Sequence, residues 1–486
     1  MDQRISNRAI LRYTILLVAS LFVINPILVN YLSVQKELSY FSILIFFLTI
    51  SMINKYSYEA LLSIVYILSI FAVDLSIPTE IYSDAIGRSP ELEVYLAAPF
   101  AVILVISTLY RIYSDSREIQ LATAQLLATI CATLFTLTLA IPIFADIPSK
   151  SAASIYFFEH LYYLLLFFTS LLIVNQSSPW TVLIPVFSSI TGNLVFAALS
   201  AVSASFGLYS VPATAELGVI SIGSLQLLKG WYASGFVGHS RELVLILMII
   251  LPFYFVRLFE SVRNRTSYLI LVLSSILILI VSDTLSGIGA FFLVSTLSLS
   301  YLLYRKISVS YIKGWPILIF TFASLFIIYM GGGWIAEFLH GTFLSVDNLS
   351  VRVEQYSLSL EILTDHPLFG IGGYNSPVFL HPHMEESVAG VHNIFLAQFV
   401  ASGLVGGTFY ISFMFLVLLW AFRKSLIATA DDQYYWFATI TGIVGFLSFS
   451  SLVMAQDWQQ AQSCFWIFSG VVLSTNTWYI GSVQIR

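Results

Sequence analysis

The chain has 486 residues, of which 58% are hydrophobic and only 10% are charged, with a formal net charge of -5. A soluble domain carries roughly 25% charged residues, so this composition excludes an ordinary soluble protein. The apolar runs are long and continuous rather than alternating, which favours membrane-spanning helices over a closed β-barrel. We therefore predict an all-α integral membrane protein. Cys131 and Cys464 both lie inside apolar runs, and nothing indicates a disulfide framework or a metal cage.

In chain order, the apolar segments predict a polytopic bundle of about fourteen transmembrane helices. The first apolar run is too long for a signal peptide, so we expect it to remain as an uncleaved span. The second and eighth spans are short. The predicted spans lie near residues 11–31, 39–53, 58–77, 93–112, 119–143, 154–174, 179–201, 243–257, 268–282, 285–304, 315–331, 404–422, 433–454 and 460–479.

The distribution of basic residues gives this topology an orientation. If the N-terminus is cytoplasmic, 15 of the 21 Lys and Arg residues fall on the inner side, as the positive-inside rule expects. An even number of spans then places both termini in the cytoplasm. The remaining six basic residues fall on the outer side, so the positive-inside rule does not explain their position. They are Lys36, Arg88, Lys150, Lys229, Arg241 and Arg352.

The predicted loops divide the chain into five parts. An N-terminal bundle of about seven spans covers 1–201, and middle transmembrane helices cover 243–331. Two long outer loops cover 202–242 and 332–403, and C-terminal helices cover 404–486. The inner loops are too short to build a nucleotide-binding site. Any chemistry is therefore expected on the outer side, with a substrate that is already energised and already in the membrane.

The first outer loop places Lys229, His239, Arg241 and Glu242 just before the eighth span. Arg offers a planar fork and Lys a point charge, so either could bind a phosphate group. The alternative is that both side chains snorkel to the membrane interface, which is common at span ends. His239 by itself is more typical of a polar interface residue than of a catalyst.

The second outer loop begins with an amphipathic helical pattern over 351–364, and the His366-Pro367 pair ends it. The glycines at 370, 372 and 373 predict a tight turn. His392 and Asn393 then open an apolar segment that we expect to be broken at Gly403 and again at 406–407. Irregular backbone at membrane depth is tolerated where it lines a cavity, so Arg352 and His392 become candidates for a pocket at the outer surface.

Other polar residues of this loop admit plainer interpretations. His381, His383 and Glu385 alternate in a way that suits a loop, and no further ligand is evident, so no metal site is predicted. His366, which precedes a proline, is more typical of a turn that ends a helix.

Four pieces of the second loop resemble the O-antigen polymerase and O-antigen ligase superfamily of bacterial envelopes. They are Arg352, 366–372 (HPLFGIG), 391–396 (VHNIFL) and 403–407 (GLVGG), in this order before the last spans. Weaker similarities lie at 233–238 and 284–287, so the resemblance covers roughly 230–425. Two arginines of the family pattern are absent: Tyr232 lies near the position of one, where Lys229 or Arg241 could substitute, and the other is missing at 286–287.

The resemblance implies a metal-independent glycosyltransferase of GT-C-like architecture, without cofactors, in the bacterial inner membrane with its active site in the periplasm. Its donor would be a glycan on undecaprenyl pyrophosphate, and its product a longer O-antigen or related surface polysaccharide. Its partners would be this lipid-linked oligosaccharide, membrane lipids and a chain-length regulator, with no nucleic acid. His392 is expected to activate the acceptor hydroxyl and Arg352 to stabilise the leaving diphosphate. The expected substrate-binding residues are Arg241, Lys229, His239, Tyr374 and Asn393.

Three other functions remain open. A ligase of the same superfamily would move the finished glycan onto lipid A-core or a protein. A transporter or flippase of lipid-linked glycans would place ionisable groups inside its spans, for which the candidates are Asp74, Glu59, Glu159, His160 and Asp283. A structural scaffold would leave the outer Arg and His residues unexplained.

Overall fold

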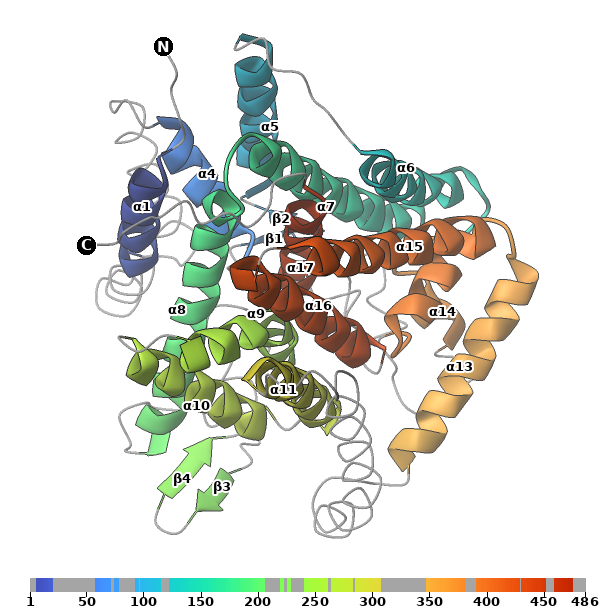
Figure 1. Cartoon of the computed structure of the whole chain (residues 1–486). Coiled ribbons are helices and arrows are strands. Elements are labelled where there is room, and N and C mark those ends of the chain that lie inside the picture. Colours follow the sequence, from blue (N-terminus) through green and yellow to red (C-terminus); the bar gives the residue numbers. More distant parts are fainter. Residues whose placement is uncertain are drawn as a thin grey trace, which may run out of the picture.

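The computed structural model is mainly helical (Figure 1). It describes residues 6–20, 57–70, 74–77, 92–95, 97–114, 122–205, 219–222, 225–228, 240–260, 264–282, 285–306, 347–380, 390–428, 430–451 and 459–474. The predicted spans at 39–53 and 315–331 lie outside these residues. The described helices are α1 (Asn7–Ala19), α4 (Ser57–Leu68), α5 (Ala97–Ser114), α6 (Thr123–Thr138), the 3-10 helix η3 (Ile141–Phe144), α7 (Lys150–Gln176), α8 (Trp180–Ser205), α9 (Ser240–Glu260), α10 (Arg265–Val281), α11 (Leu285–Lys306), α13 (Asp347–Asp365), α14 (Ser376–Leu380), α15 (Ile394–Ile427), α16 (Ala430–Ser450) and α17 (Gln459–Leu473).

Six helical segments of the described chain are long and apolar enough to cross a membrane. They are Ala97–Ser114, Thr123–Phe144, Lys150–Gln176, Trp180–Leu199, Arg241–Phe259 and Ile394–Ile427. Three shorter apolar helices accompany them, at Tyr58–Leu68, Arg265–Val281 and Gly287–Tyr301. The chain therefore has the helices of a membrane protein, while the total of about fourteen spans stays a prediction.

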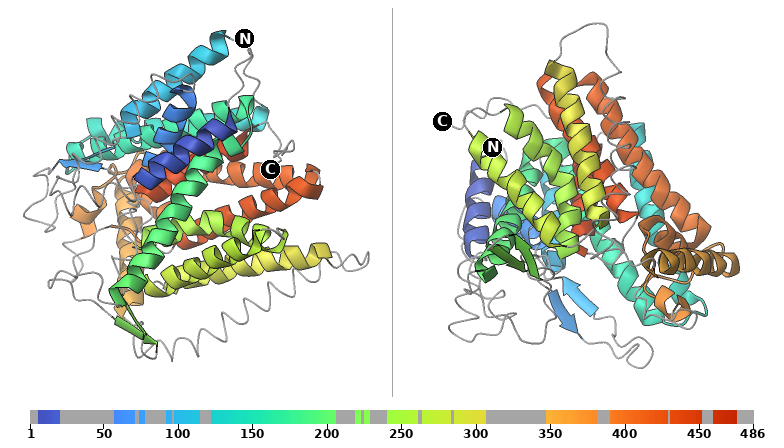
Figure 2. Two further views of the ribbon diagram at one scale, coloured as in Figure 1. Left: turned by 90° about the vertical axis from the view of Figure 1, so that its left-hand side faces the viewer. Right: turned by 90° about the horizontal axis from the view of Figure 1, so that it is seen from below.

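Two short antiparallel hairpins interrupt the helical pattern. Strands β1 (Asp74–Ile77) and β2 (Leu92–Tyr95) pair with Asp74 opposite Tyr95. Strands β3 (Val219–Ile222) and β4 (Leu225–Leu228) pair within the first long loop. The predicted span 58–77 was wrong in its last four residues, which pair as a strand rather than continue the helix. In both views of Figure 2 the hairpins lie toward one end of the bundle, as do α13 and α14.

Helix α17 forms the centre of the bundle, because every residue from Gln459 to Leu473 is buried. It packs on α7, α9 and α15. Trp466 of α17 stacks on Phe413 of α15, with ring centroids 4.9 Å apart. The first turn of α17 is held by Glu242 of α9, whose Oε1 accepts the backbone N–H groups of Gln460 (2.8 Å) and Ala461 (3.0 Å). A carboxylate at this position satisfies otherwise unpaired amides and suits the positive end of the helix.

Helix α15 is broken at Gly403, where φ is +67° and the backbone is not helical. The break at Gly403 is confirmed, but the expected second break at 406–407 was wrong, since these residues continue the helix. A Cβ at Gly406 would overlap Ser402 and Thr138, and one at Gly407 would overlap the ring of Phe399. Both glycines therefore serve close packing rather than a change of backbone direction.

The gap in the helix is filled by the turn that follows α13. Four backbone hydrogen bonds of 2.7 to 3.2 Å join the turn 367–372 to the broken ends of α15. With the donor named first, they run from Ile371 to Val400, Gly372 to Ala401, Leu404 to Pro367 and Val405 to Leu368. The turn supplies the partners that the broken helix lacks, which a buried backbone requires. It thereby fixes the end of α13 relative to the start of α15.

Candidate functional site

His392 lies immediately before α15 and contacts α13 through two hydrogen bonds. Its Nδ1 lies 2.9 Å from Oε1 of Gln355, a residue that is 1% exposed. The hydroxyl of Tyr356 donates to the backbone carbonyl of His392, also at 2.9 Å. The ring and the backbone of His392 are thus both tied to the same helix.

The hydrogen bond to Gln355 decides which nitrogen of His392 carries the proton. An amide oxygen only accepts hydrogen bonds, so Nδ1 of the neutral ring must be the donor. The other nitrogen, Nε2, then carries the lone pair. An oriented imidazole with an available lone pair is what a general base requires.

Two arginines act electrostatically on His392. The pKa of His392 is lowered from its ordinary value to about 4, first by burial and then by the positive charges of Arg352 and Arg241. Arg352 comes from α13 and is half-buried, whereas Arg241 is exposed in the first turn of α9. His392 is therefore neutral at pH 7, and two guanidinium groups lie within electrostatic range of it.

The structure thus brings together three of the residues that the sequence indicated: His392, Arg352 and Arg241. Gln355 and Tyr356 were missed, although a signal for them existed. They follow Arg352 by three and four positions, so all three share one face of the predicted helix. The face that carries the arginine is the face that contacts His392.

Tyr374 and Asn393 make structural contacts. Tyr374 has φ of +59°, and its hydroxyl donates to Oε2 of buried Glu159 at 2.7 Å. Gln459, at the start of α17, donates to the other oxygen of Glu159 at 3.4 Å. Asn393 is the N-cap of α15, and its side-chain oxygen accepts the N–H of Leu396 at 3.0 Å. Both residues hold the frame of the site.

Lys229 and His239 lie outside the described residues, as do His381, His383 and Glu385. His366 follows α13 as expected, in the turn that enters the break of α15.

Three ionisable groups of the transporter alternative form hydrogen bonds within the protein; they are Glu59, Glu159 and His160. Glu59 of α4 accepts the backbone N–H of Ser6 at 3.1 Å, just before α1. Nδ1 of His160 lies 2.9 Å from the carbonyl of Tyr156, one turn earlier in α7. Asp74 lies in β1, and Asp283 lies outside the described residues.

No family model matches the chain, and no curated protein matches it. The candidate site consists of a neutral imidazole with a fixed tautomer and two guanidinium groups, positioned by α9, α13 and α15. Such a group of side chains can bind a phosphate or diphosphate and accept a proton beside it.

We expect Tyr374→Phe to lower stability without weakening substrate binding. The variant keeps the ring, which packs against Tyr156 with centroids 5.0 Å apart, but removes the hydroxyl that donates to buried Glu159. Losing a hydrogen bond to a carboxylate costs about 1.5–3 kcal/mol. Thermal unfolding of the purified protein should show the loss, while Tyr110→Phe, at a position 69% exposed, should not. An unchanged melting temperature with a raised KM for donor would instead assign Tyr374 to the substrate.

Proposed function

We propose that this protein is a glycosyltransferase that polymerises polyprenyl-pyrophosphate-linked oligosaccharide repeats at the outer face of a bacterial inner membrane. The observation that carries the proposal is the position of His392, which is held by Gln355 on α13 and lies within electrostatic range of Arg352 and Arg241. The similarity of 366–372, 391–396 and 403–407 to the O-antigen polymerase and ligase superfamily supports it, and so do the long apolar helices.

The reaction follows from the chemistry of these side chains. The acceptor hydroxyl donates its proton to Nε2 of His392, and its oxygen forms a bond to the anomeric carbon of the donor glycan. The bond between that carbon and the diphosphate oxygen breaks, and the diphosphate leaves with the electron pair. Arg352 and Arg241 stabilise the negative charge that develops on the leaving group.

The same charges adjust the base during the reaction. In the free enzyme both guanidinium groups favour the neutral form of His392, so the base is ready at pH 7. A bound diphosphate offsets the two positive charges and raises the pKa of His392 toward its ordinary value. A base whose pKa lies nearer the working pH accepts a proton more readily, so donor binding prepares His392 for the transfer.

The proposal is tested by supplying the purified protein with undecaprenyl-pyrophosphate-linked repeat units and nothing else. A ladder of longer lipid-linked glycans is the expected result. Transfer that occurs only after lipid A-core is added would replace the polymerase with a ligase. An unchanged donor in both reactions, from protein that is folded and membrane-inserted, would contradict the glycosyltransferase assignment.

We expect Arg352→Gln to lower kcat/KM for the lipid-linked donor by about tenfold to a hundredfold, below the ~10²–10³-fold typical of losing one preorganised donor, because Arg241 remains. Removing this charge also raises the pKa of His392 from about 4. Neutral His392 is the active form, so activity is lost as pH falls through that pKa. The acidic limb of the kcat/KM profile should therefore move to higher pH in Arg352→Gln.

Two further variants test this result. Arg352→Lys keeps the charge, so its acidic limb should stay near that of the natural protein while the rate falls. Arg423→Gln removes an exposed arginine from the far end of α15. It should leave both kcat/KM and the pH of the acidic limb unchanged. An acidic limb that does not move in Arg352→Gln would show that Arg352 does not act on the base.

A further inference from the structure

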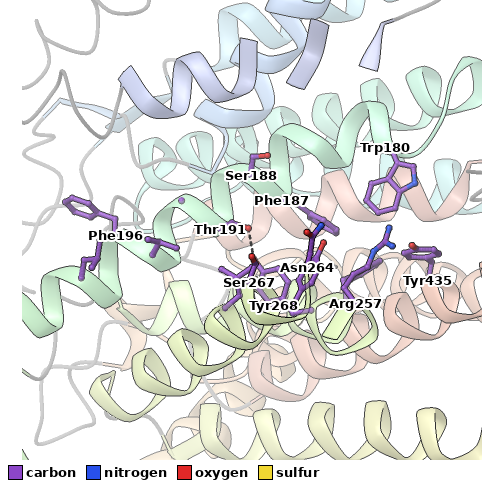
Figure 3. Close-up of a pocket in the computed structure, with 16 residues that line it drawn as sticks. Trp180, Phe187, Ser188, Thr191, Phe196, Arg257, Asn264, Ser267, Tyr268 and Tyr435 are labelled. Carbon is purple, nitrogen blue, oxygen red and sulfur yellow. Dashed lines mark hydrogen bonds between the residues drawn. The ribbon is translucent and has the colours of Figure 1, made fainter. Parts of the chain in front are cut away.

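A second site lies between α8, α9, α10 and α16. These helices line an elongated cavity of about 870 Å³, which is within the usual range for a small-molecule site (Figure 3). Its lining includes Arg257 of α9, whereas Arg241 near His392 lies in the first turn of the same helix. At about 1.5 Å per residue, roughly 24 Å of helix separates these two arginines, so the cavity reaches the opposite end of the bundle from the candidate active site.

The two ends of this cavity differ in character. Arg257, Trp180 and Tyr435 lie together at one end, and Phe196 lies at the other (Figure 3). Near Phe196 the lining includes Val195, which is 38% exposed, and Leu199, which is 63% exposed. From Trp180 to Leu199 the cavity follows about 28 Å of α8, close to the thickness of a bilayer core. The cavity is thus long, apolar over most of its length and polar at one end.

Arg257 determines the charge of the polar end. Of the described residues that line the cavity, it carries the single formal charge. Its guanidinium carbon lies 5.1 Å from the centre of the Tyr435 ring, which is a cation–π contact. The five N–H donors of a guanidinium match the geometry of a phosphate group. Trp180 and Tyr435 beside it are the residue types that concentrate at membrane interfaces.

We propose that this cavity binds one anionic glycerophospholipid, with an acyl chain along α8 and the headgroup phosphate at Arg257. The apolar part of the cavity is long enough to hold an extended acyl chain, and the arginine beside two aromatic rings complements a phosphate at the interface. The predicted topology places Arg257 at the cytoplasmic leaflet, where anionic lipids attract basic residues. This inference does not depend on the proposed glycosyl transfer.

The test is lipid retention by the full-length protein. The protein is purified in detergent, incubated with equal amounts of phosphatidylglycerol and phosphatidylethanolamine, and the bound lipid is counted by native mass spectrometry. We expect one phosphatidylglycerol per chain. Arg257→Gln should reduce its retention about fivefold, the factor that corresponds to about 1 kcal/mol for one basic residue near a lipid surface. Arg265→Gln, which removes an exposed arginine from the start of α10, is the matched control and should retain the lipid.

A second variant tests the chain-binding end. Val195→Trp fills the apolar part of the cavity, so it should release the lipid even though Arg257 is intact. Equal losses in Arg257→Gln and Arg265→Gln would show general charge attraction and overturn the proposal. Equal retention of the two lipids, or full retention by Val195→Trp in a monodisperse preparation, would overturn it as well. So would displacement of phosphatidylglycerol by an equal amount of undecaprenyl phosphate, since the occupant would then be a polyprenyl lipid.

Discussion

Replacing His392 with alanine should lower the rate of glycan transfer by about 10²–10⁴-fold, the usual contribution of a general base. The loss should appear in kcat, because the proton is transferred only as the new bond forms. From α13, Gln355 holds the imidazole and Tyr356 holds the backbone of His392, so the Tyr356 hydrogen bond survives the substitution. Helix α15 also keeps its N-cap at Asn393, so the protein should still fold and insert.

His366→Ala is the matched control for this substitution. His366 lies in the turn after α13, and its ring lies 6.1 Å from that of Phe379, centroid to centroid. Its loss should leave transfer intact. Transfer measured on the lipid-linked donor, with membrane insertion checked in parallel, compares the two variants. Normal activity in His392→Ala would remove His392 from the mechanism, and equal inactivity in both variants would point to damage of the fold.

Two substitutions of Gln355 show in the same assay whether this residue positions the base His392. Gln355→Leu removes the acceptor at Nδ1, so the tautomer is no longer fixed and kcat should fall. The fall should be smaller than in His392→Ala, because the imidazole ring remains. Gln355→Glu restores an acceptor, and its negative charge should raise the pKa of His392. That variant should recover activity with an acidic limb at higher pH, an effect that a purely structural role for Gln355 would not produce.

Much of the second loop could be predicted because its signals are local. A proline such as Pro367 disfavours helical backbone in the residue before it, and glycine at position 403 permits a backbone conformation that other residues avoid. At positions 406 and 407 glycine is required for a different reason, because neighbouring side chains leave no room for a Cβ. Sequence does not distinguish a glycine needed for its φ angle from one needed for its small size, so the second break was wrongly predicted.

The candidate site could be predicted in its charged residues but not in its contacts. Arg352 and His392 belong to one loop, whereas the packing of α9 in the bundle brings Arg241 within electrostatic range of His392. The bond between Tyr374 and Glu159 joins the loop to α7, far away in the sequence. Strand β1 was similarly hidden, because its pairing with β2 depends on a distant partner. Contacts of this kind follow from the tertiary fold, which no local pattern specifies.

Replacing Gly403 with alanine should strongly destabilise the protein and disable the site together. At φ of +67° a Cβ would overlap the carbonyl of Leu368 and the amide nitrogen of Phe369, both backbone atoms of the turn that fills the break. The backbone conformation of Gly403, with φ of +67° and ψ of -171°, is essentially restricted to glycine and costs another residue about 1–3 kcal/mol. Overpacking adds about 1–3 kcal/mol, so we expect a loss of about 2–6 kcal/mol in the free energy of unfolding, measured by thermal or denaturant unfolding in detergent.

Gly289→Ala provides the matched control, because a Cβ at Gly289 in α11 would meet no atom of the described residues within 4 Å. That substitution should be neutral or stabilising by up to about 1 kcal/mol, since alanine favours the helix. Activity should fall in Gly403→Ala even at temperatures where the protein stays folded, because moving the turn displaces α13 and with it Arg352 and Gln355. A variant that is destabilised yet transfers glycan at the natural rate would show that the turn holds the bundle together without positioning the base.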